Sequence, residues 1–154
     1  MVYPKGEASI EELEKVSTRI INQDSEVNRC IYPLASQSGI EWNNVKLYKC
    51  DINQSRIKTL QAADHKVSES LRTRKLFERV WQFPVVLVPF GFDDQGKESV
   101  ILRPIESIDA MSASVGKLPW EFLNEVAQEI LKDEVISAVF LDITTKPPGT
   151  IEWE

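Results

Sequence analysis

An amphipathic helical pattern that leads directly into an apolar strand pattern occurs twice in this chain of 154 residues. The first copy joins helical spacing in residues 9–22 to an apolar run at 27–34, and the second joins 119–132 to 136–143. Because each helix must bury its apolar face and each strand must pair, the pattern favours a sheet with helices packed against it. An α+β protein can also show such a repeat by chance, so the pattern suggests a duplication without establishing one.

The segments between the two copies complete the order of elements. Residues 60–80 show helical spacing, and 84–92 read as a strand whose prolines, near both ends, are typical of a sheet edge. The turn at 93–96 leads into a partner strand at 98–105, and 45–52 predict a further short strand. We therefore predict an α+β fold: a small two-layer antiparallel sheet with helices on one face, whose C-terminal α-β-β-α-β unit follows a partial copy of itself.

The domain organisation follows from the same repeat. We expect a partial first subdomain at residues 1–58, made of helix, strand and linker, and a C-terminal subdomain at 59–154. Ser9 and Glu12 give a capping-box pattern at the start of the first helix, and Leu13, Val16 and Ile20 are expected on its buried face. The hairpin that should precede this helix is missing, and Met1–Glu7 are a candidate remnant of one of its strands.

The charge balance narrows the function classes. The net charge is −6, which argues against a sequence-independent nucleic-acid binder, because such a protein needs a cationic surface. No apolar run approaches the roughly 20 residues that span a bilayer, and no basic-then-apolar signal pattern opens the chain. We therefore expect a cytoplasmic protein that binds neither nucleic acid nor membrane.

Cysteine and histidine are too few to predict a metal site. Cys30 and Cys50 are the two cysteines of the chain, and we expect Cys30 to be a buried small hydrophobic residue. His65 is the single histidine, and we expect it to face solvent on a helix. Without a cluster of such ligands, neither a metal centre nor an imidazole-based triad is predicted.

The last nine residues, 146–154, are the most unusual segment for function. Pro147 and Pro148 predict an extended course, while Gly149 allows a bend or the close approach of another group. Trp153 is expected to fold back onto the body of the protein, because a large apolar ring is costly to leave in water. The alternative is a solvated, charged tail.

This segment, from residue 143 to 154, resembles the C-terminal signature of GMP synthase, the glutamine-hydrolysing ligase of purine biosynthesis. Residues 81–87, 102–104 and 107–112 resemble that family in the same order. Residues 27–32 resemble the matching strand in the extra subdomain of its longer forms. The resemblance covers the chain from about residue 8 to its end.

The resemblance implies a role in binding XMP. In this family the C-terminal domain carries dimerisation and closes the XMP pocket, while the complete enzyme adenylylates XMP with ATP and lets ammonia displace AMP to give GMP. It implies that Lys146 pairs with the XMP phosphate, that Glu152 binds the nucleoside side, and that Gln82 hydrogen-bonds the nucleotide. Arg29 and Ile151 complete the expected substrate-binding set, and no catalytic residue is implied in this chain.

The chain also departs from the family pattern. It lacks the Gly-rich pyrophosphate loop, so ATP and Mg²⁺ are expected only in the complete enzyme, and the chain alone is expected to be inactive. The partners implied are XMP, an ATP-pyrophosphatase domain in cis or in trans, and a second copy in a homodimer or an internal pseudo-dimer. Ala138 stands where many members carry an arginine, which should weaken phosphate binding unless Arg29 or another cation compensates. Arg103 is expected to form a structural ion pair with Asp109 or another carboxylate.

Two other functions stay open at this point. One is a non-catalytic oligomerisation module, or a degenerate paralogue that has lost nucleotide binding. The other is a small α+β RNA-binding module, which conflicts with the acidic balance. The helix that opens the first copy without its hairpin also indicates a portion of a longer enzyme.

Overall fold

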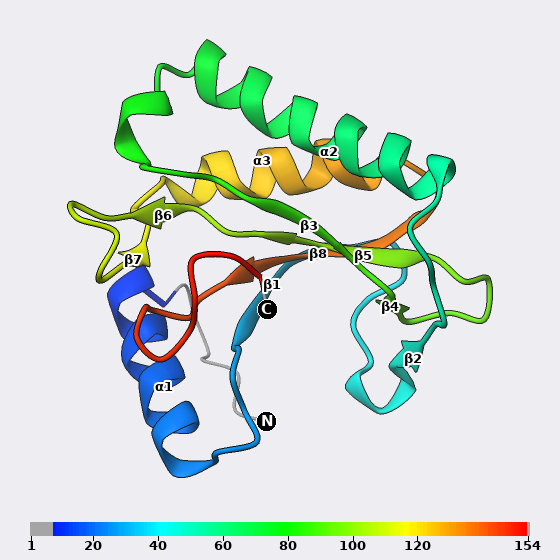
Figure 1. The fold of residues 1–154 in the computed structure, drawn as a ribbon. Coiled ribbons are helices and arrows are strands. Elements are labelled where there is room, and N and C mark those ends of the chain that lie inside the picture. The colour runs from blue at the N-terminus through cyan, green and yellow to red at the C-terminus, as the bar shows by residue number, and fades with distance from the viewer. Residues whose placement is uncertain (1–7, 154) are drawn as a thin grey trace.

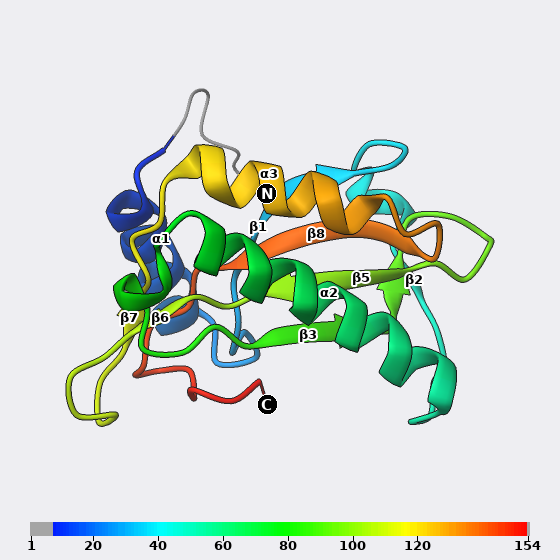
Figure 2. The ribbon, with the colours of Figure 1, turned by 90° about the horizontal axis from the view of Figure 1, so that it is seen from above.

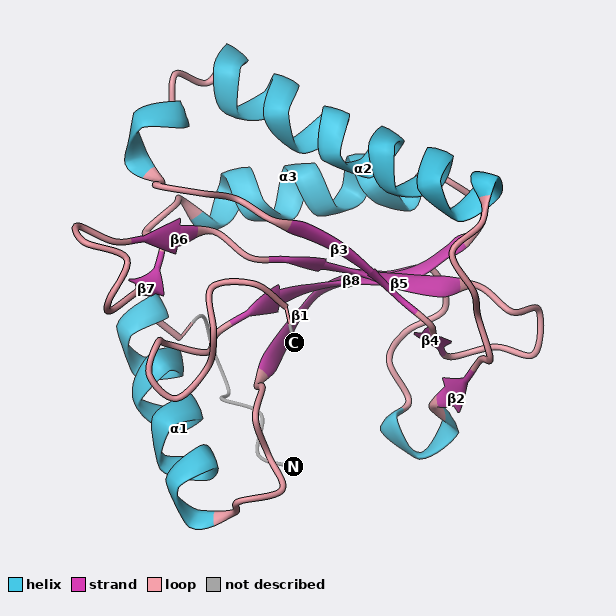
Figure 3. Cartoon of the chain, viewed as in Figure 1, coloured by secondary structure: helices cyan, strands magenta, loops and turns pink. Residues whose placement is uncertain are grey.

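The computed structural model describes residues 8–153, and its centre is a four-stranded sheet in the order β1-β8-β5-β3 (Figures 1 and 3). The strands are β1 (Ile31–Ser36), β8 (Ile136–Asp142), β5 (Glu98–Leu102) and β3 (Val85–Val88). Neighbouring strands run antiparallel, except that β5 and β8 are parallel. The predicted α+β class is confirmed, and β3 lies at the sheet edge as its flanking prolines indicated.

Two helices cover one face of this sheet. Figure 2 shows α2 (Gln54–Thr73) and α3 (Trp120–Leu131) lying side by side over the strands. Helix α2 packs on α3 and β3, while α3 packs on β1 and β8. Leu123, Val126 and Ile130 of α3 are buried in the resulting core, which also takes in Val67 and Leu71 of α2. Among residues 8–153, no helix is long and apolar enough to cross a membrane.

The opposite face of the sheet carries a smaller aromatic core. Phe140 of β8 is fully buried there and packs against Trp42, Phe90 and Phe92 at ring-centroid distances of 5.7–6.2 Å. The cover consists of irregular chain, together with β4 (Phe90–Gly91), which pairs with β2 (Lys46–Leu47). Trp153 also packs on this cluster, so the tail folds back onto the body as expected.

Helix α1 (Ile10–Gln23) lies at one end of the sheet, where it packs against β7 (Ser114–Val115) (Figure 1). The capping box is confirmed, because the Ser9 side chain accepts from the Glu12 amide and the Glu12 carboxylate accepts from the Ser9 amide. The expected apolar stripe is wrong in part: Leu13 is buried, but Val16 and Ile20 are 43% and 41% exposed. Because α1 lies at the end of the sheet, it contacts fewer residues of the core than α3, which lies across the face of the sheet.

Three elements differ in their bounds from the sequence prediction. Helix α2 begins at Gln54 because the Asn53 side chain accepts a hydrogen bond from the Arg56 amide and caps the helix. The strand predicted at 45–52 shrinks to β2, and the predicted strand at 98–105 divides into β5 and β6 (Ile105–Glu106), which pairs with β7. His65 is exposed on α2 as expected, Cys30 is half-buried rather than buried, and Cys50 is exposed.

The two helix–strand copies meet at the pairing of β1 with β8. The repeat aligns Tyr32 with Leu141, and these two residues lie directly opposite one another in the antiparallel ladder. Ile31 lies opposite Asp142 and Pro33 opposite Phe140, as expected when a local two-fold axis relates the strands. The edge strand of the sheet therefore comes from the predicted first subdomain, and the division at residue 58 stays a prediction. Residues Met1–Glu7, the candidate strand remnant, lie outside the described residues.

Candidate functional site

The C-terminal segment leaves β8 and turns back toward the sheet instead of running extended. Gly149 donates its amide to the Thr145 carbonyl at 2.9 Å, which closes a turn in which both X-Pro bonds, at Pro147 and Pro148, are cis. The expected extended course is therefore wrong. The close approach at Gly149 is confirmed, because a Cβ atom built there would lie 2.9 Å from the Thr144 methyl and 3.2 Å from a guanidinium nitrogen of Arg29.

Arg103, which directly follows β5, contacts the tail through its buried side chain and is only 2% exposed. Its guanidinium forms an ion pair with Asp142, which confirms the expected pairing with a carboxylate. It also donates to the carbonyls of Ile151 at 2.8 Å, Thr144 at 3.2 Å and Thr150. Burial lowers the pKa of Arg103, and the neighbouring Asp142 counteracts that shift.

Arg29, just before β1, holds the same segment from the side. Its side chain is 7% exposed and pairs with Asp142 at 3.2 Å. The guanidinium donates to the Thr150 carbonyl at 3.2 Å, to the Thr150 hydroxyl at 2.7 Å and to the Glu152 carbonyl at 2.5 Å. It also lies 5.1 Å from the centre of the Trp153 ring, within the range of a cation–π contact.

We call Arg29, Arg103 and Asp142 the tail clasp. Two guanidinium groups share one carboxylate oxygen of Asp142, so this cluster of nearly buried side chains carries one excess positive charge. Burying an unbalanced charge is costly unless its donors are satisfied. Here tail carbonyls supply the remaining acceptors, so the backbone position of the tail is tied to the charge balance of the cluster.

Lys146 is anchored through both its backbone and its side chain. Its amide and carbonyl pair with those of Ala113 at 2.8 and 2.9 Å, and its ammonium donates to the Ala110 carbonyl at 2.7 Å. The Ala110 loop is itself closed, because the Ser107 hydroxyl accepts from the Ala110 amide and donates to the Ser112 carbonyl. The Lys146 side chain therefore has a defined direction on the surface of this loop.

The other predicted site residues are arranged around these anchors. The backbone carbonyls of Ile151 and Glu152 accept from the clasp, while the exposed Glu152 carboxylate makes no hydrogen bond among residues 8–153. Gln82 is exposed and bridges Ile105 at the start of β6. Because β6 pairs with β7 and Ala113 bridges Lys146, Gln82 and Lys146 flank the same hairpin from opposite sides.

Ala138 belongs to the smaller core on which Trp153 of the tail also packs. It is fully buried in the aromatic core on β8, among Val88, Ile101 and Phe140. The Arg29 guanidinium, from the equivalent position of the first copy, instead reaches the tail. Sequence reasoning did not single out Asp142, although a carboxylate inside an otherwise apolar strand was a visible signal for a buried ion pair.

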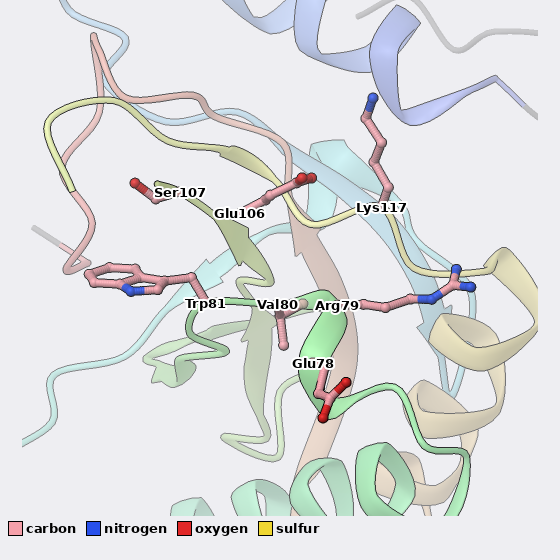
Figure 4. Close-up of a pocket in the computed structure, with 7 residues that line it drawn as sticks. All are labelled: Glu78, Arg79, Val80, Trp81, Glu106, Ser107 and Lys117. Atoms are coloured by element: carbon pink, nitrogen blue, oxygen red, sulfur yellow. The ribbon is translucent and has the colours of Figure 1, made fainter. Parts of the chain in front are cut away.

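A separate pocket of about 480 Å³ opens beside the β6–β7 hairpin (Figure 4). Trp81 and Ser107 lie on one side of it, and Arg79 and Lys117 lie on the other. None of the five predicted substrate-binding residues lines this pocket, although Trp81 directly precedes Gln82. Sequence reasoning gave Arg79 and Lys117 no role, because neither stands in a recognisable motif.

Comparison with known proteins relates the larger, C-terminal part of this chain to one family. Residues 69–153 match the family model described as the GMP synthase C terminal domain. A probable GMP synthase (glutamine-hydrolyzing) of Leptospira interrogans is 36% identical over 142 residues, covering 92% of this chain and 23% of the relative. GMP synthases of Thermosipho africanus and Bacteroides thetaiotaomicron are 41% and 38% identical over 111 residues, covering 68% of the chain and 22% of each relative. The chain thus spans about a quarter of the length of the curated relatives it matches.

Proposed function

The chain belongs to the family of the GMP synthase C-terminal domain, and on this premise we propose that it binds XMP and closes the XMP site of a GMP synthase with its tail. In the complete enzyme, XMP would be converted to GMP with ATP and glutamine-derived ammonia, and we expect this to occur in the cytoplasm. The names of the relatives do not favour the alternative of a non-catalytic module that has lost nucleotide binding.

The observation that carries the proposal is the ordered tail. A nucleotide lid needs functional groups that are held in place before the ligand arrives, because ordering them later costs affinity. The clasp fixes the carbonyls of Ile151 and Glu152, while the Glu152 carboxylate stays exposed and able to accept from a ribose hydroxyl or a ring N–H. The Lys146 ammonium has two further donors beyond its bond to Ala110, which suit a phosphate.

The spacing of Gln82 and Lys146 supports the same proposal. They are separated by the two strands of the β6–β7 hairpin, which is three strand spacings of about 4.8 Å each. An extended nucleoside monophosphate presents its base and its phosphate at opposite ends. We propose that the Gln82 amide contacts the purine end while Lys146 contacts the phosphate, with Arg29 as a further cation near the tail.

An internal pseudo-dimer is our proposal for the dimerisation role. The pairing of repeat-equivalent Tyr32 and Leu141 resembles the contact that two identical strands make about a two-fold axis. In a chain with a single copy, the same edge of β8 would be free to pair with a second molecule. Here β1 covers that edge, so we propose that the first copy replaces a partner subunit at this edge.

We further propose that an ATP-pyrophosphatase domain, in cis or in trans, completes the site and holds ATP and Mg²⁺. Among residues 8–153, no group of three or more His, Cys, Asp or Glu side chains is arranged to hold a metal ion. Two large apolar side chains lie in the loop that Lys146 contacts. Ile108 is fully exposed, and Met111 is 77% exposed. Such large apolar side chains beside the proposed nucleotide site would suit the contact with that second domain.

Calorimetric titration of the chain with XMP tests the proposal. We expect saturable binding that Lys146→Ala reduces by at least about tenfold, since hydrogen bonds to charged groups contribute about 1.5–3 kcal/mol. Lys66→Ala is the matched control, because the Lys66 ammonium also donates to a backbone carbonyl, that of Glu129 at 2.8 Å, but on the helical face. The absence of binding at millimolar XMP, or equal losses in both variants, would contradict the proposal.

A further inference from the structure

We propose that Arg103, held by Asp142, is a positioning residue for XMP binding: it sets the geometry of the tail without touching the nucleotide. The inference rests on the proposed function, because it concerns the same site. It adds a role for two buried residues that are not in the predicted substrate-binding set. Its basis is the distribution of their hydrogen bonds along the tail.

Arg103 donates to carbonyls on both sides of the Pro-Pro turn. Its three carbonyl acceptors belong to Thr144, Thr150 and Ile151, so one guanidinium joins the exit of β8 to the far side of the Pro-Pro turn. The fork of five N–H groups on a planar guanidinium has a fixed geometry. The positions of these carbonyls relative to one another are therefore set by a single rigid group.

Asp142 sets the orientation of that group in turn. It is fully buried, and one carboxylate oxygen accepts from the Thr144 amide at 2.9 Å. The other oxygen accepts from Arg103 and from Arg29. Because Asp142 is the last residue of β8, the rigid sheet fixes the carboxylate, the carboxylate fixes the guanidinium, and the guanidinium fixes the tail.

This chain of contacts ends at the Glu152 side chain. The carbonyl before it, of Ile151, is held by Arg103, and its own carbonyl is held by Arg29 and by the Thr150 hydroxyl at 2.6 Å. The backbone on both sides of the carboxylate is thus fixed, while the carboxylate itself stays free. A group arranged in this way meets its ligand without paying the entropy of ordering the backbone at that moment.

The test is Arg103→Lys in the full chain, with Arg56→Lys as the matched control. Lysine keeps the positive charge beside Asp142 but cannot reach three separate carbonyls with one ammonium. Arg56 of α2 is also a partly buried arginine with a bidentate carboxylate partner, Glu98. Glu98 is the first residue of β5, whereas Arg103 follows the last one, so this pair marks the opposite end of the strand. We expect Arg103→Lys to lower XMP affinity by at least about tenfold and Arg56→Lys to leave it unchanged.

Hydrogen exchange of the tail amides separates positioning from a general loss of stability. In Arg103→Lys, we expect the amides of Lys146 and Gly149 to exchange at least about tenfold faster while those of β5 and β8 keep their protection. Saturating XMP should restore the tail protection of the variant, because binding and ordering are thermodynamically linked. If Arg103 were merely structural, the variant would exchange faster throughout the sheet, and XMP would not restore the protection of the tail.

Thr150→Val covers the case in which Arg103→Lys does not fold. Thr150 is exposed, and its hydroxyl links Arg29 to the Glu152 carbonyl. Its loss therefore loosens the residue that directly follows the Ile151 carbonyl held by Arg103, without disturbing the core. We expect XMP affinity to fall about threefold, with faster exchange confined to the tail. If the wild-type chain binds XMP and both variants bind it equally well, the positioning role is overturned but the proposed function is not. Failure of the wild-type chain to bind XMP overturns the proposed function and, with it, this inference.

Discussion

The two helix–strand copies show what position in a fold does to similar sequence patterns. In the second copy every residue of β8 is buried and α3 lies within the main core, whereas β1 is an edge strand with one buried residue. Helix α1 leaves Val16 and Ile20 half exposed. The difference arises because β8 has neighbours on both sides and both faces, while β1 has one neighbour. An apolar pattern therefore identifies an element, but the topology decides how much of it is buried.

The copies differ most at one pair of equivalent positions. Arg29 in the first copy reaches out to the tail, and Ala138 in the second copy lies within the aromatic core. The small side chain at 138 leaves room for Phe140 and its aromatic neighbours. The first copy thus supplies a charged contact, and the second supplies part of the core.

Placing an arginine at the core position of the second copy should give the largest loss of stability. Ala138→Arg forces a guanidinium into a site that is 0% exposed and lined by apolar groups, and we expect it to destabilise the fold by more than about 3 kcal/mol. Asn28→Arg, at an exposed position beside Arg29, should change stability by less than about 0.5 kcal/mol. Urea unfolding measures both variants. A well-folded Ala138→Arg protein would show that the second copy can still host the arginine, and it would break the contrast.

A second prediction compares one isoleucine from the helix of each copy. Ile130 of α3 is 1% exposed and Ile20 of α1 is 41% exposed. We expect Ile130→Ala to cost about 3 kcal/mol, because it leaves a cavity in the main core, and Ile20→Ala to cost less than about 1 kcal/mol. Thermal and urea unfolding give the two values. Equal losses would mean that Ile20 is covered in solution, for example by a second copy of the chain.

The helices and strands were largely predictable, because their apolar periodicity is local. The capping box at Ser9 and Glu12 and the strand β8 followed from neighbouring residues alone. The start of α2 was missed because its first turns carry few apolar residues, and the signal was a cap at Asn53 instead. Polar capping residues would have placed that boundary better than hydrophobic spacing did.

For the candidate site, the sequence offered residues but no geometry. The resemblance supplied Lys146, Glu152, Gln82, Arg29 and Ile151, and their contacts with XMP stay predictions. An ion pair of Arg103 was expected, but not its sharing of Asp142 with Arg29, because Asp142 meets Arg103 across 39 residues and Arg29 across 113. Pairing of that kind is decided by strand order and register, which local patterns do not contain.

The smallest expected effect concerns Arg29, and it sharpens the comparison of the two copies. Arg29→Ala removes the bonds to Thr150 and Glu152 and the contact with Trp153, but Asp142 keeps its pairing with Arg103. Because the remaining carboxylate is not left unpaired, we expect the free energy of unfolding to fall by about 1–2 kcal/mol instead of by the larger penalty of an orphaned buried charge.

Arg74→Ala is the control, since the Arg74–Glu125 pair is about half exposed on both sides and should contribute less than about 1 kcal/mol. Urea unfolding compares the two, and hydrogen exchange should show faster exchange in the tail alone. A loss of stability in Arg29→Ala as large as that in Ala138→Arg would mean that the arginine of the first copy stabilises the whole sheet. The contrast between a copy that supplies a charged contact and a copy that supplies part of the core would then no longer hold.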